Sequence, residues 1–163
     1  MTMGIGKYKN FNFRTIQKGD EQTVRTIIFD ILQDYELTLD IEGVDHDLFN
    51  IVEHYKSGLF AVVEDSETEK IVGSFALFPL NSEQIELRKM YLLKECRGKG
   101  VGKWIIEFCI QKAKDLGYST ITLESASVLK EALQLYLSKG FTRVTIPNHT
   151  ERCDVVMEYD LNG

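Results

Sequence analysis

A glycine-rich segment lying between a strand and a helix constrains the fold of this chain more than any other feature of the sequence. Residues 83–93 predict a β-strand, and residues 101–117 carry apolar side chains at the i, i+3, i+4 spacing of an amphipathic helix. The β-branched run at 120–124 predicts a second strand. Two strands joined through one helix pair in parallel with a right-handed connection, so residues 83–125 indicate an α/β sheet.

The remaining segments add further strands and helices. We expect strands at 11–16, 59–64, 71–80, 141–146 and 154–159, and helices at 21–35, at 45–56 and from 129 to a terminating glycine at 140. The expected inward-facing stripes are Val24, Ile27, Ile28, Ile31 and Tyr35; Leu48, Val52 and Tyr55; Val101, Trp104, Ile105, Phe108, Cys109 and Ala113; and Leu129, Ala132, Leu133, Tyr136 and Leu137. The predicted fold class is α/β (α+β), with a mixed, partly antiparallel central sheet flanked by about four helices.

Composition and charge argue against several classes of protein. The 163 residues, 44% of them hydrophobic and 27% charged, are typical of one globular domain spanning 1–163. The longest uncharged stretch, 71–82, is shorter than the roughly 20 residues that a membrane span needs. Residues 1–10 lack the apolar core of a signal peptide. A net charge of −6 disfavours a nucleic-acid partner.

Cysteine and histidine usage bears on metal binding and on the compartment. The cysteines and histidines are dispersed without metal-ligand spacing: Cys96, Cys109 and Cys153; His46, His54 and His149. An odd number of scattered cysteines is typical of a reducing compartment, so we expect a cytoplasmic protein without a metal. Cys96 follows the pattern of a structural thiol, because no histidine or acid partner accompanies the neighbouring Arg97.

The charges are unevenly distributed along the chain. Residues 30–53 contain eight acidic side chains and no lysine or arginine, whereas residues 88–103 contain six basic side chains and one acid. Either run alone is explained by a solvated surface. Together they offer one segment that attracts cations and one that attracts anions.

The basic run contains the glycine-rich segment, residues 97–103. Its glycines allow a ligand to approach the backbone, and the following helix begins with N–H groups that attract an anion. The spacing fits neither a Walker loop nor the G-x-G-x-x-G dinucleotide fingerprint, because Gly98, Gly100 and Gly102 are evenly spaced. The segment therefore predicts a pyrophosphate site of another kind; the alternative is a turn needed only for packing.

The same segment resembles the R/Q-x-x-G-x-G/A signature of the Gcn-five-related N-acetyltransferase (GNAT) superfamily, with Arg97, Gly100 and Gly102 in the signature positions. Residues 86–91 resemble the strand that precedes this signature in the family. Residues 132–141 resemble the family's A-x-x-L-Y-x-x-x-G-F ending. The resemblance covers roughly residues 71–145.

This resemblance implies acetyl-CoA as the co-substrate and a central sheet that is splayed in its middle. The implied binding residues are Arg97, Gly98, Lys99, Gly100, Val101, Gly102 and Lys103 for the pyrophosphate, and Met90, Tyr91 and Leu92 for pantetheine, which would pair as an added strand. Many members of the family have an asparagine where this chain has Leu129. The corresponding contact is then either missing or supplied by Ser125 or Ser127.

The resemblance also implies two catalytic residues and an N-acetyltransferase reaction. Glu86 matches the position of a glutamate base in some members; the alternative is a strand glutamate that pairs with Arg88. Tyr136 matches the tyrosine that protonates the leaving thiolate; the alternative is a core tyrosine on the apolar stripe of its helix. The oxyanion is expected to be held by a backbone N–H near residues 90–92.

The expected acceptor is a primary amine, either a small molecule or a peptide. The acidic run at 30–53 favours a cationic amine, and we expect the segments 20–56 and 147–153 to select it. The alternative to an enzyme is a catalytically silent acyl-CoA-binding sensor or interaction module. Edge pairing of the C-terminal strands would give a route to a homodimer.

Overall fold

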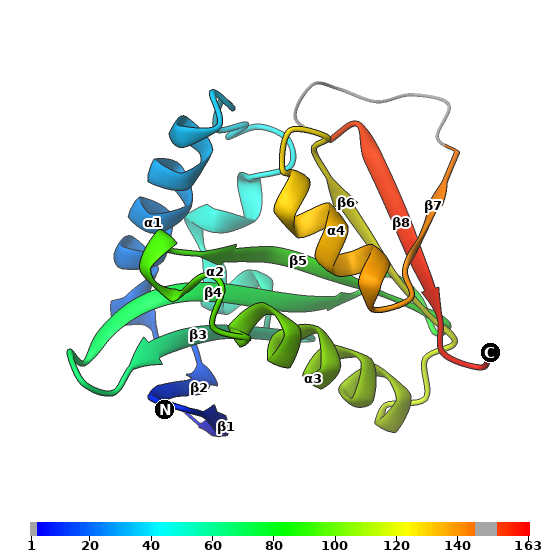
Figure 1. Ribbon diagram of the computed structural model, residues 1–163, viewed down its shortest axis with the longest axis horizontal. Coiled ribbons are helices and arrows are strands. Elements are labelled where there is room, and N and C mark those ends of the chain that lie inside the picture. The colour runs from blue at the N-terminus through cyan, green and yellow to red at the C-terminus, as the bar shows by residue number, and fades with distance from the viewer. Residues whose placement is uncertain (1–2, 146–152) are drawn as a thin grey trace. The chain divides into compact units, whose positions relative to one another are not determined.

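The computed structural model describes residues 3–145 and 153–163 (Figure 1). The strands of this part of the chain are β1 (Gly4–Tyr8), β2 (Phe11–Thr15), β3 (Leu59–Asp65), β4 (Lys70–Pro79), β5 (Gln84–Leu92), β6 (Thr120–Ser125), β7 (Thr142–Val144) and β8 (Val155–Asp160). The helices are α1 (Glu21–Asp34), α2 (Ile51–His54), α3 (Val101–Asp115) and α4 (Lys130–Ser138), with short 3-10 turns η1 (Lys18–Asp20), η2 (His46–Phe49) and η3 (Lys94–Cys96). The strands are hydrogen-bonded in the order β1-β2-β3-β4-β5-β6-β8-β7. The predicted mixed α/β class is therefore confirmed.

The chain divides into two compact units. The first unit comprises Met1–Ala76 and Lys89–Val101, and the second comprises Leu77–Arg88 and Gly102–Gly163. Strands β4 and β5 each pass from one unit into the other along their length. Each unit is described separately below.

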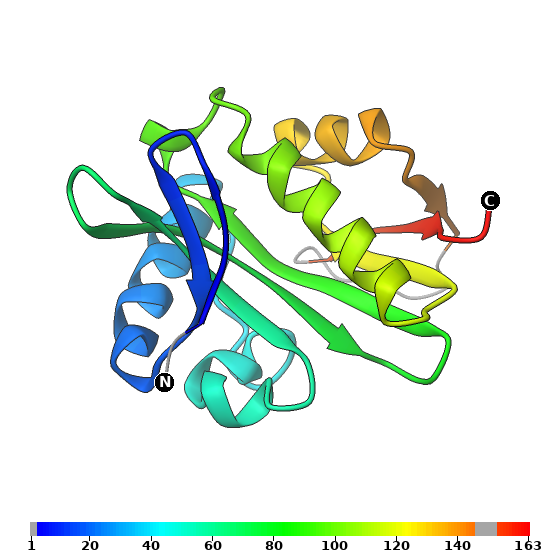
Figure 2. The ribbon, with the colours of Figure 1, turned by 90° about the horizontal axis from the view of Figure 1, so that it is seen from below.

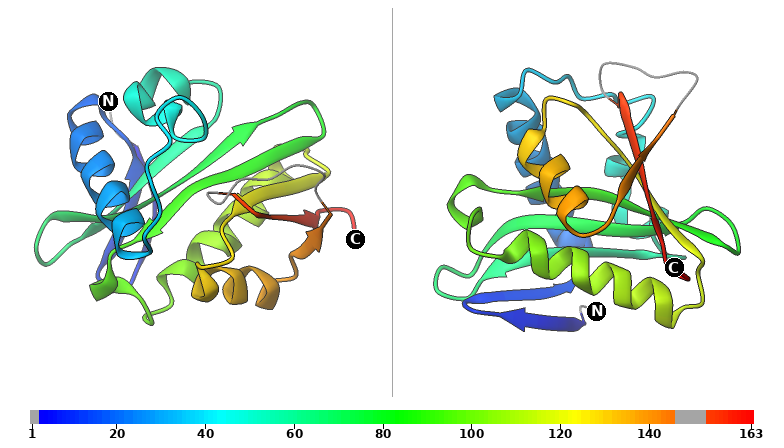
Figure 3. Two further views of the ribbon diagram at one scale, coloured as in Figure 1. Left: turned by 90° about the horizontal axis from the view of Figure 1, so that it is seen from above. Right: turned by 45° about the vertical axis from the view of Figure 1, so that its right-hand side comes forward.

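The first unit is built on antiparallel strands covered by helices. Strand β2 pairs with β1 and with β3, and Phe13 lies opposite Val63. The ring of Phe13 contacts the ring of Phe75 edge-on, with 6.4 Å between centroids. Helix α1 buries Val24, Ile28 and other members of the expected stripe. Figure 3 (left) shows α1 and α2 on the same side of β2 and β3. The burial of this apolar stripe fixes α1 on the sheet.

Two features of the first unit differ from the sequence-based expectation. Strand β1 was not expected, because Gly4–Tyr8 has little apolar character; its pairing with β2 comes from the tight turn that follows Tyr8. The expected helix 45–56 is interrupted at Asn50, whose φ of −169° and ψ of 65° separate η2 from α2. The interruption changes the helical phase, so Ile51 is buried and Val52 is 40% exposed. The expectation that Val52 faces inward is wrong.

The second unit contains the parallel strand pair that the sequence predicted. Strand β6 pairs in parallel with β5, where Glu86 lies opposite Thr122, and antiparallel with β8. Strand β7 pairs with the other side of β8. Helix α4 lies beside β6 (Figure 1; Figure 3, right), and the ion pair of Lys139 with Glu107 links its C-terminal end to α3. This arrangement confirms the strand–helix–strand prediction for 83–125.

Helix α4 buries a narrower stripe than the sequence suggested. Leu133 and Tyr136 are buried, but Leu137 is 48% exposed. Viewed down the helix, Tyr136 lies about 60° to one side of Leu133 and Leu137 about 40° to the other side, since successive residues of an α-helix are about 100° apart. The buried stripe runs from Leu133 toward Tyr136, so Leu137 falls beyond its edge. The expectation that Leu137 faces inward is wrong.

Candidate functional site

The glycine-rich loop has the backbone conformation that its glycines permit. Gly98 has φ of +73° and Gly100 has φ of +88°, both in the left-handed region that a side chain disfavours. A Cβ on Gly98 would meet no heavy atom within 4 Å, so one face of the loop is open. A Cβ on Gly100 would lie 2.5 Å from the Tyr8 hydroxyl. The loop therefore presents accessible backbone at Gly98 and is closely packed at Gly100.

Arg97 joins the loop to the end of β5. Its Nε donates to the carbonyl oxygen of Leu92 at 2.9 Å, and its Nη1 lies 3.5 Å from the hydroxyl of Tyr35 at the end of α1. Two of the segments expected to bind the co-substrate, residues 90–92 and 97–101, are thus brought together within the first unit. The carbonyl of Leu92, at the end of β5, therefore already accepts a hydrogen bond within the protein.

The β1–β2 turn brings residues to the loop that sequence reasoning missed. Lys9 Nζ donates to the carbonyl oxygen of Lys99 at 3.0 Å, and Tyr8 packs over Gly100. Figure 2 shows the tip of this hairpin beside the segment that precedes α3. Lys9 therefore adds a cation beside Lys99 in the first unit. Nothing in the sequence indicated this contact, because the two lysines are 90 residues apart.

The remaining loop residues lie in the first turn of α3. Val101 is buried at the start of the helix, Gly102 is buried after it, and Lys103 is exposed. The first turn of α3 contains no acidic side chain. A helix N-terminus usually has an acid there to complement its partial positive charge. The partial positive charge of this terminus is therefore not complemented by an acidic side chain of the first turn.

Glu86 lies in the second unit with an arginine as its partner. Its Oε1 accepts a hydrogen bond from Arg88 Nε in an ion pair, and the Arg88 guanidinium lies 4.2 Å from the ring centroid of Phe78. The pairing with Arg88 is the structural alternative that the sequence left open, and it is present. This ion pair explains the position of the Glu86 carboxylate without requiring that Glu86 takes part in catalysis.

Glu124 of β6 is an acid near Glu86 that sequence reasoning missed. Partial burial, followed by the charge of Glu86, raises the pKa of Glu124 above its usual value, and Arg88 opposes the shift. A raised carboxyl pKa brings an acid closer to the range useful for proton transfer. Glu86 lies opposite Thr122 in the parallel pairing of β5 with β6, so Glu124 is two residues further along the neighbouring strand. The expected parallel pairing of these strands was the only feature of the sequence that could have pointed to Glu124.

Tyr136 lies on the inner face of α4 in the second unit. It is 6% exposed, and its ring is tilted against that of Phe141, which in turn contacts Tyr159 of β8. This packing is what a core tyrosine would show. The aromatic contacts fix the ring, so the hydroxyl has a defined position.

The residues around Leu129 show which side chain could replace the asparagine that many GNAT members have at this position. Leu129 precedes α4 and provides no side-chain cap. Ser127 donates through both its N–H and its hydroxyl to the carboxylate of Asp154, at 2.7 and 2.6 Å. Ser125 is buried in β6. Because the Ser127 hydroxyl is already committed to Asp154, Ser125 is the better candidate for the contact.

The three cysteines differ in exposure. Cys96 and Cys109 are buried and Cys153 is partly exposed. Burial raises the pKa of Cys96 to about 11, with a smaller contribution from Glu95 that outweighs the neighbouring Arg97. Burial also raises the pKa of Cys109. Both buried thiols are therefore structural, as expected for Cys96.

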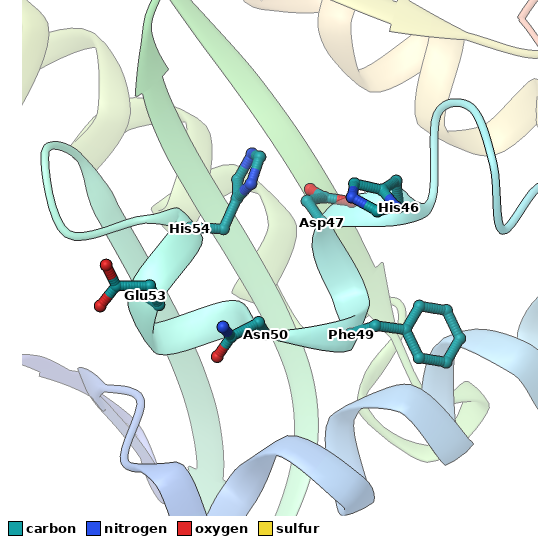
Figure 4. Close-up of a pocket in the computed structure, with 6 residues that line it drawn as sticks. All are labelled: His46, Asp47, Phe49, Asn50, Glu53 and His54. Atoms are coloured by element: carbon teal, nitrogen blue, oxygen red, sulfur yellow. The ribbon is translucent and has the colours of Figure 1, made fainter.

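The acidic segment contains a pocket of about 260 Å³ in the first unit. Its lining residues are His46, Asp47, Phe49, Asn50, Glu53 and His54, contributed by η2, α2 and the residue between them (Figure 4). Glu53 is paired with the exposed Lys56 at 2.7 Å, and this partner lowers its pKa. In residues 3–145 and 153–163 no group of three or more histidine, cysteine, aspartate or glutamate side chains could hold a metal ion. Nor does any helix there have the length and apolarity to cross a bilayer. The expected acceptor segment 147–153 lies outside the described residues apart from Cys153.

Comparison with known proteins agrees with this arrangement. A family model described as an acetyltransferase (GNAT) domain matches residues 56–143. The Escherichia coli protein named Uncharacterized N-acetyltransferase YjgM is 29% identical over 136 residues, covering 80% of this chain and 81% of that protein. Human N-acetyltransferase 8B is 31% identical over 104 residues, covering 60% of this chain and 45% of that protein. The chain thus spans less than half of this human relative.

Solved structures share the fold at low sequence identity. An acetyltransferase of the GNAT family from Staphylococcus aureus has a TM-score of 0.83 at 21% identity, covering 93% of this chain and 99% of that one. The acetyltransferase yncA from Salmonella typhimurium, solved with acetyl-CoA, has a TM-score of 0.72 at 16% identity, covering 94% and 95%. A spermidine N-acetyltransferase from Vibrio cholerae, solved with CoA and spermine, has a TM-score of 0.69 at 19% identity, covering 94% and 96%.

Proposed function

The chain belongs to the GNAT acetyltransferase family and is an acetyl-CoA-dependent N-acetyltransferase; on this basis we propose that it transfers the acetyl group directly to a cationic primary amine in a ternary complex. The observation that carries the proposal is the glycine loop. Gly98 and Gly100 are left-handed, Lys99 lies between them, and Lys9 donates to the carbonyl oxygen of Lys99. An open backbone beside positive charge is what a pyrophosphate needs. We take residues 1–163 as one catalytic domain.

In this proposal acetyl-CoA is held by two kinds of contact. The pyrophosphate accepts hydrogen bonds from the N–H groups of residues 97–103, with Arg97, Lys99 and Lys103 supplying positive charge. The pantetheine arm pairs as an added strand with the backbone of Met90, Tyr91 and Leu92. Ser125 supplies the contact that an asparagine makes elsewhere in the family.

The reaction requires a neutral amine. A lysine-like amine with a pKa of about 10.4 is neutral in about one molecule in 2,500 at pH 7, a penalty of about 4.6 kcal/mol. Glu86, directly or through a water, takes the proton from the ammonium, and the nitrogen lone pair then attacks the thioester carbonyl carbon. A backbone N–H of residues 90–92 stabilises the oxyanion. As the C–S bond breaks, Tyr136 donates its proton to the CoA thiolate, the nitrogen loses its second proton to solvent to form the amide, and Tyr136 is reprotonated from solvent.

The acceptor is a small cationic amine or a lysine side chain. The acidic run at 30–53, which lines the pocket at Asp47 and Glu53, favours a positively charged substrate. The spermidine N-acetyltransferase that shares the fold acts on a polyamine, which supports this class of acceptor. The scattered cysteines favour the cytoplasm as the compartment. Pairing through the C-terminal strands would form a homodimer.

The proposal is tested by calorimetric titration with acetyl-CoA, followed by assays of CoA release. We expect one-site binding at micromolar concentration, and faster CoA release with cationic amines than with neutral amines of matched size, with a difference that falls as salt rises. No detectable binding would contradict the assignment of the glycine loop. Binding without turnover on any amine would support the silent acyl-CoA-binding module instead. Equal, salt-independent rates for both amine classes would remove the cationic preference.

A further inference from the structure

Lys89 is a lysine at a core position of strand β5. The alternation that buries Ile85 and Leu87 also buries Lys89, which is 8% exposed. Its φ of +51° is left-handed inside an otherwise extended strand. A residue with a Cβ persists in that conformation only where its surroundings hold it. Met90 and Tyr91 of the proposed pantetheine strand follow immediately.

The Lys89 side chain is held by the segment 44–47. Its Nζ donates to the Val44 carbonyl oxygen at 2.7 Å and to Asp45 Oδ1 at 2.8 Å, and lies 3.2 Å from Asp47 Oδ1. Asp45 is completely buried, and its other oxygen accepts the N–H of Asp40 at 2.8 Å. A buried ammonium with this many partners anchors the acidic segment to β5.

The anchored carboxylates extend the connection to α2. Asp47 Oδ2 accepts a hydrogen bond from the hydroxyl of Tyr55, the residue that follows α2. Asp47 also lines the pocket shown in Figure 4. One lysine therefore faces two buried carboxylates, Asp45 and Asp47, which belong to the segment expected to receive the amine. We call Lys89, Asp45, Asp47 and Tyr55 the buried lysine cluster.

The Lys89 backbone is held from β4. Ser74 Oγ donates to the Lys89 carbonyl oxygen at 2.8 Å in a buried hydrogen bond. One residue earlier, a Cβ on Gly73 would lie 2.7 Å from the Tyr91 carbonyl oxygen, so the two strands approach closely there. The backbone that precedes Met90 and Tyr91 is thus fixed by β4, and the left-handed turn in it is fixed by the buried lysine cluster.

We propose that Lys89 is a positioning residue for acetyl transfer. Its side chain holds β5 in the conformation in which Met90 and Tyr91 present their backbone groups to the pantetheine arm. The same ammonium orders the acidic segment 40–55, so the co-substrate strand and the acceptor segment depend on one contact. This inference rests on the proposed function. A core filled by an apolar side chain would serve stability as well or better, which makes a purely structural role the weaker account of a buried lysine.

The test compares three variants with the wild type. Lys89→Met/Asp45→Asn/Asp47→Asn removes the ammonium and both carboxylates that face it while conserving volume, so none of these charges is left buried without a partner. Lys89→Gly/Asp45→Asn/Asp47→Asn also removes the Cβ, so the backbone at this position can leave the left-handed conformation. Lys56→Met is the matched control, because Lys56 is exposed and pairs only locally with Glu53. Each is measured by amide hydrogen exchange of the ligand-free protein and by calorimetric titration with acetyl-CoA, well below the melting temperature.

We expect the amides of residues 90–92 to exchange at least tenfold faster in both Lys89 variants, and the Kd for acetyl-CoA to rise at least fivefold. Lys56→Met should change neither quantity. The inference is overturned if the Lys89 variants keep wild-type exchange at 90–92 and a Kd within twofold while only their melting temperatures fall. A wild-type protein that does not bind acetyl-CoA would overturn the proposed function, whereas normal binding by both Lys89 variants would overturn only the role of Lys89.

Discussion

Replacing the two left-handed glycines of the loop one at a time separates backbone strain from packing. Gly98→Ala adds a methyl group where no heavy atom lies within 4 Å, at a φ of +73°. Only the conformational cost remains, about 1–2 kcal/mol for a residue with a Cβ. For a domain of this size that loss lowers the melting temperature by about 2–4 °C per kcal/mol, so we expect a decrease of about 2–8 °C.

Gly100→Ala should cost more. Its φ of +88° carries the same conformational penalty, and the new Cβ would lie 2.5 Å from the Tyr8 hydroxyl oxygen. Real Cβ contacts are not that short, so the Tyr8 ring has to rotate. A side chain displaced by about 30° from its rotamer costs about 0.5–1.5 kcal/mol. We therefore expect a loss of about 1.5–3.5 kcal/mol in all for Gly100→Ala.

The packing part of this cost should be removable. Without the hydroxyl, the nearest ring carbons would lie 3.2 and 3.3 Å from the new Cβ, distances that a small shift relieves. Tyr8→Phe/Gly100→Ala, compared with Tyr8→Phe alone, should then lose about as much stability as Gly98→Ala does in the wild-type background. Urea denaturation followed by circular dichroism measures all five proteins. Equal losses for Gly98→Ala and Gly100→Ala, with no effect of Tyr8→Phe on the latter, would refute the reasoning.

Four further predictions concern the proposed chemistry and the titration of Glu124. Glu86→Gln should lower turnover mainly below the pKa of the amine, and an unchanged pH–rate profile would remove its role as a base. Tyr136→Phe should keep the affinity for acetyl-CoA and lower the rate by about 10²–10⁴; full activity would return Tyr136 to the core. Lys9→Met should raise the Kd for acetyl-CoA several-fold at low salt, and the exposed Lys7→Met on the same hairpin is the control that should not. The raised pKa of Glu124, caused first by partial burial and then by Glu86, means that its contribution to stability is present below the ordinary value of 4.5 and is lost as pH rises through the raised value. Glu124→Gln should therefore stabilise the protein more at pH 7 than at pH 4, and equal urea midpoint shifts at the two pH values would contradict this.

The parts of the fold that the sequence predicted are those with a strong local pattern. Helix α3 has a long apolar stripe, β6 has a β-branched run, and the glycine spacing of residues 97–103 restricts the loop between β5 and α3. Each of these signals is formed by residues that are close together in the sequence. The family resemblance then located the expected binding residues on the same segment.

The parts that the sequence did not predict depend on contacts between distant residues. Strand β1 is stabilised by its pairing with β2 and not by its own composition. The prediction that Val52 faces inward was wrong because the non-helical backbone of Asn50 shifted the helical phase. Lys9 contacts Lys99, which is 90 residues away along the chain. Nothing in the sequence distinguishes Lys89 from a surface lysine. A periodic pattern carries no information about which charged side chain a fold buries.

The unequal exposure of the three cysteines has a practical consequence. Cys96 and Cys109 are shielded from reagents by burial, whereas Cys153 is partly exposed. A thiol-reactive fluorophore should therefore attach at Cys153 in the native protein without removal of the other two. Cys153 closes the 147–153 segment that we expect to help select the acceptor, so the natural sequence already provides a single attachment point for a dye that would report amine binding.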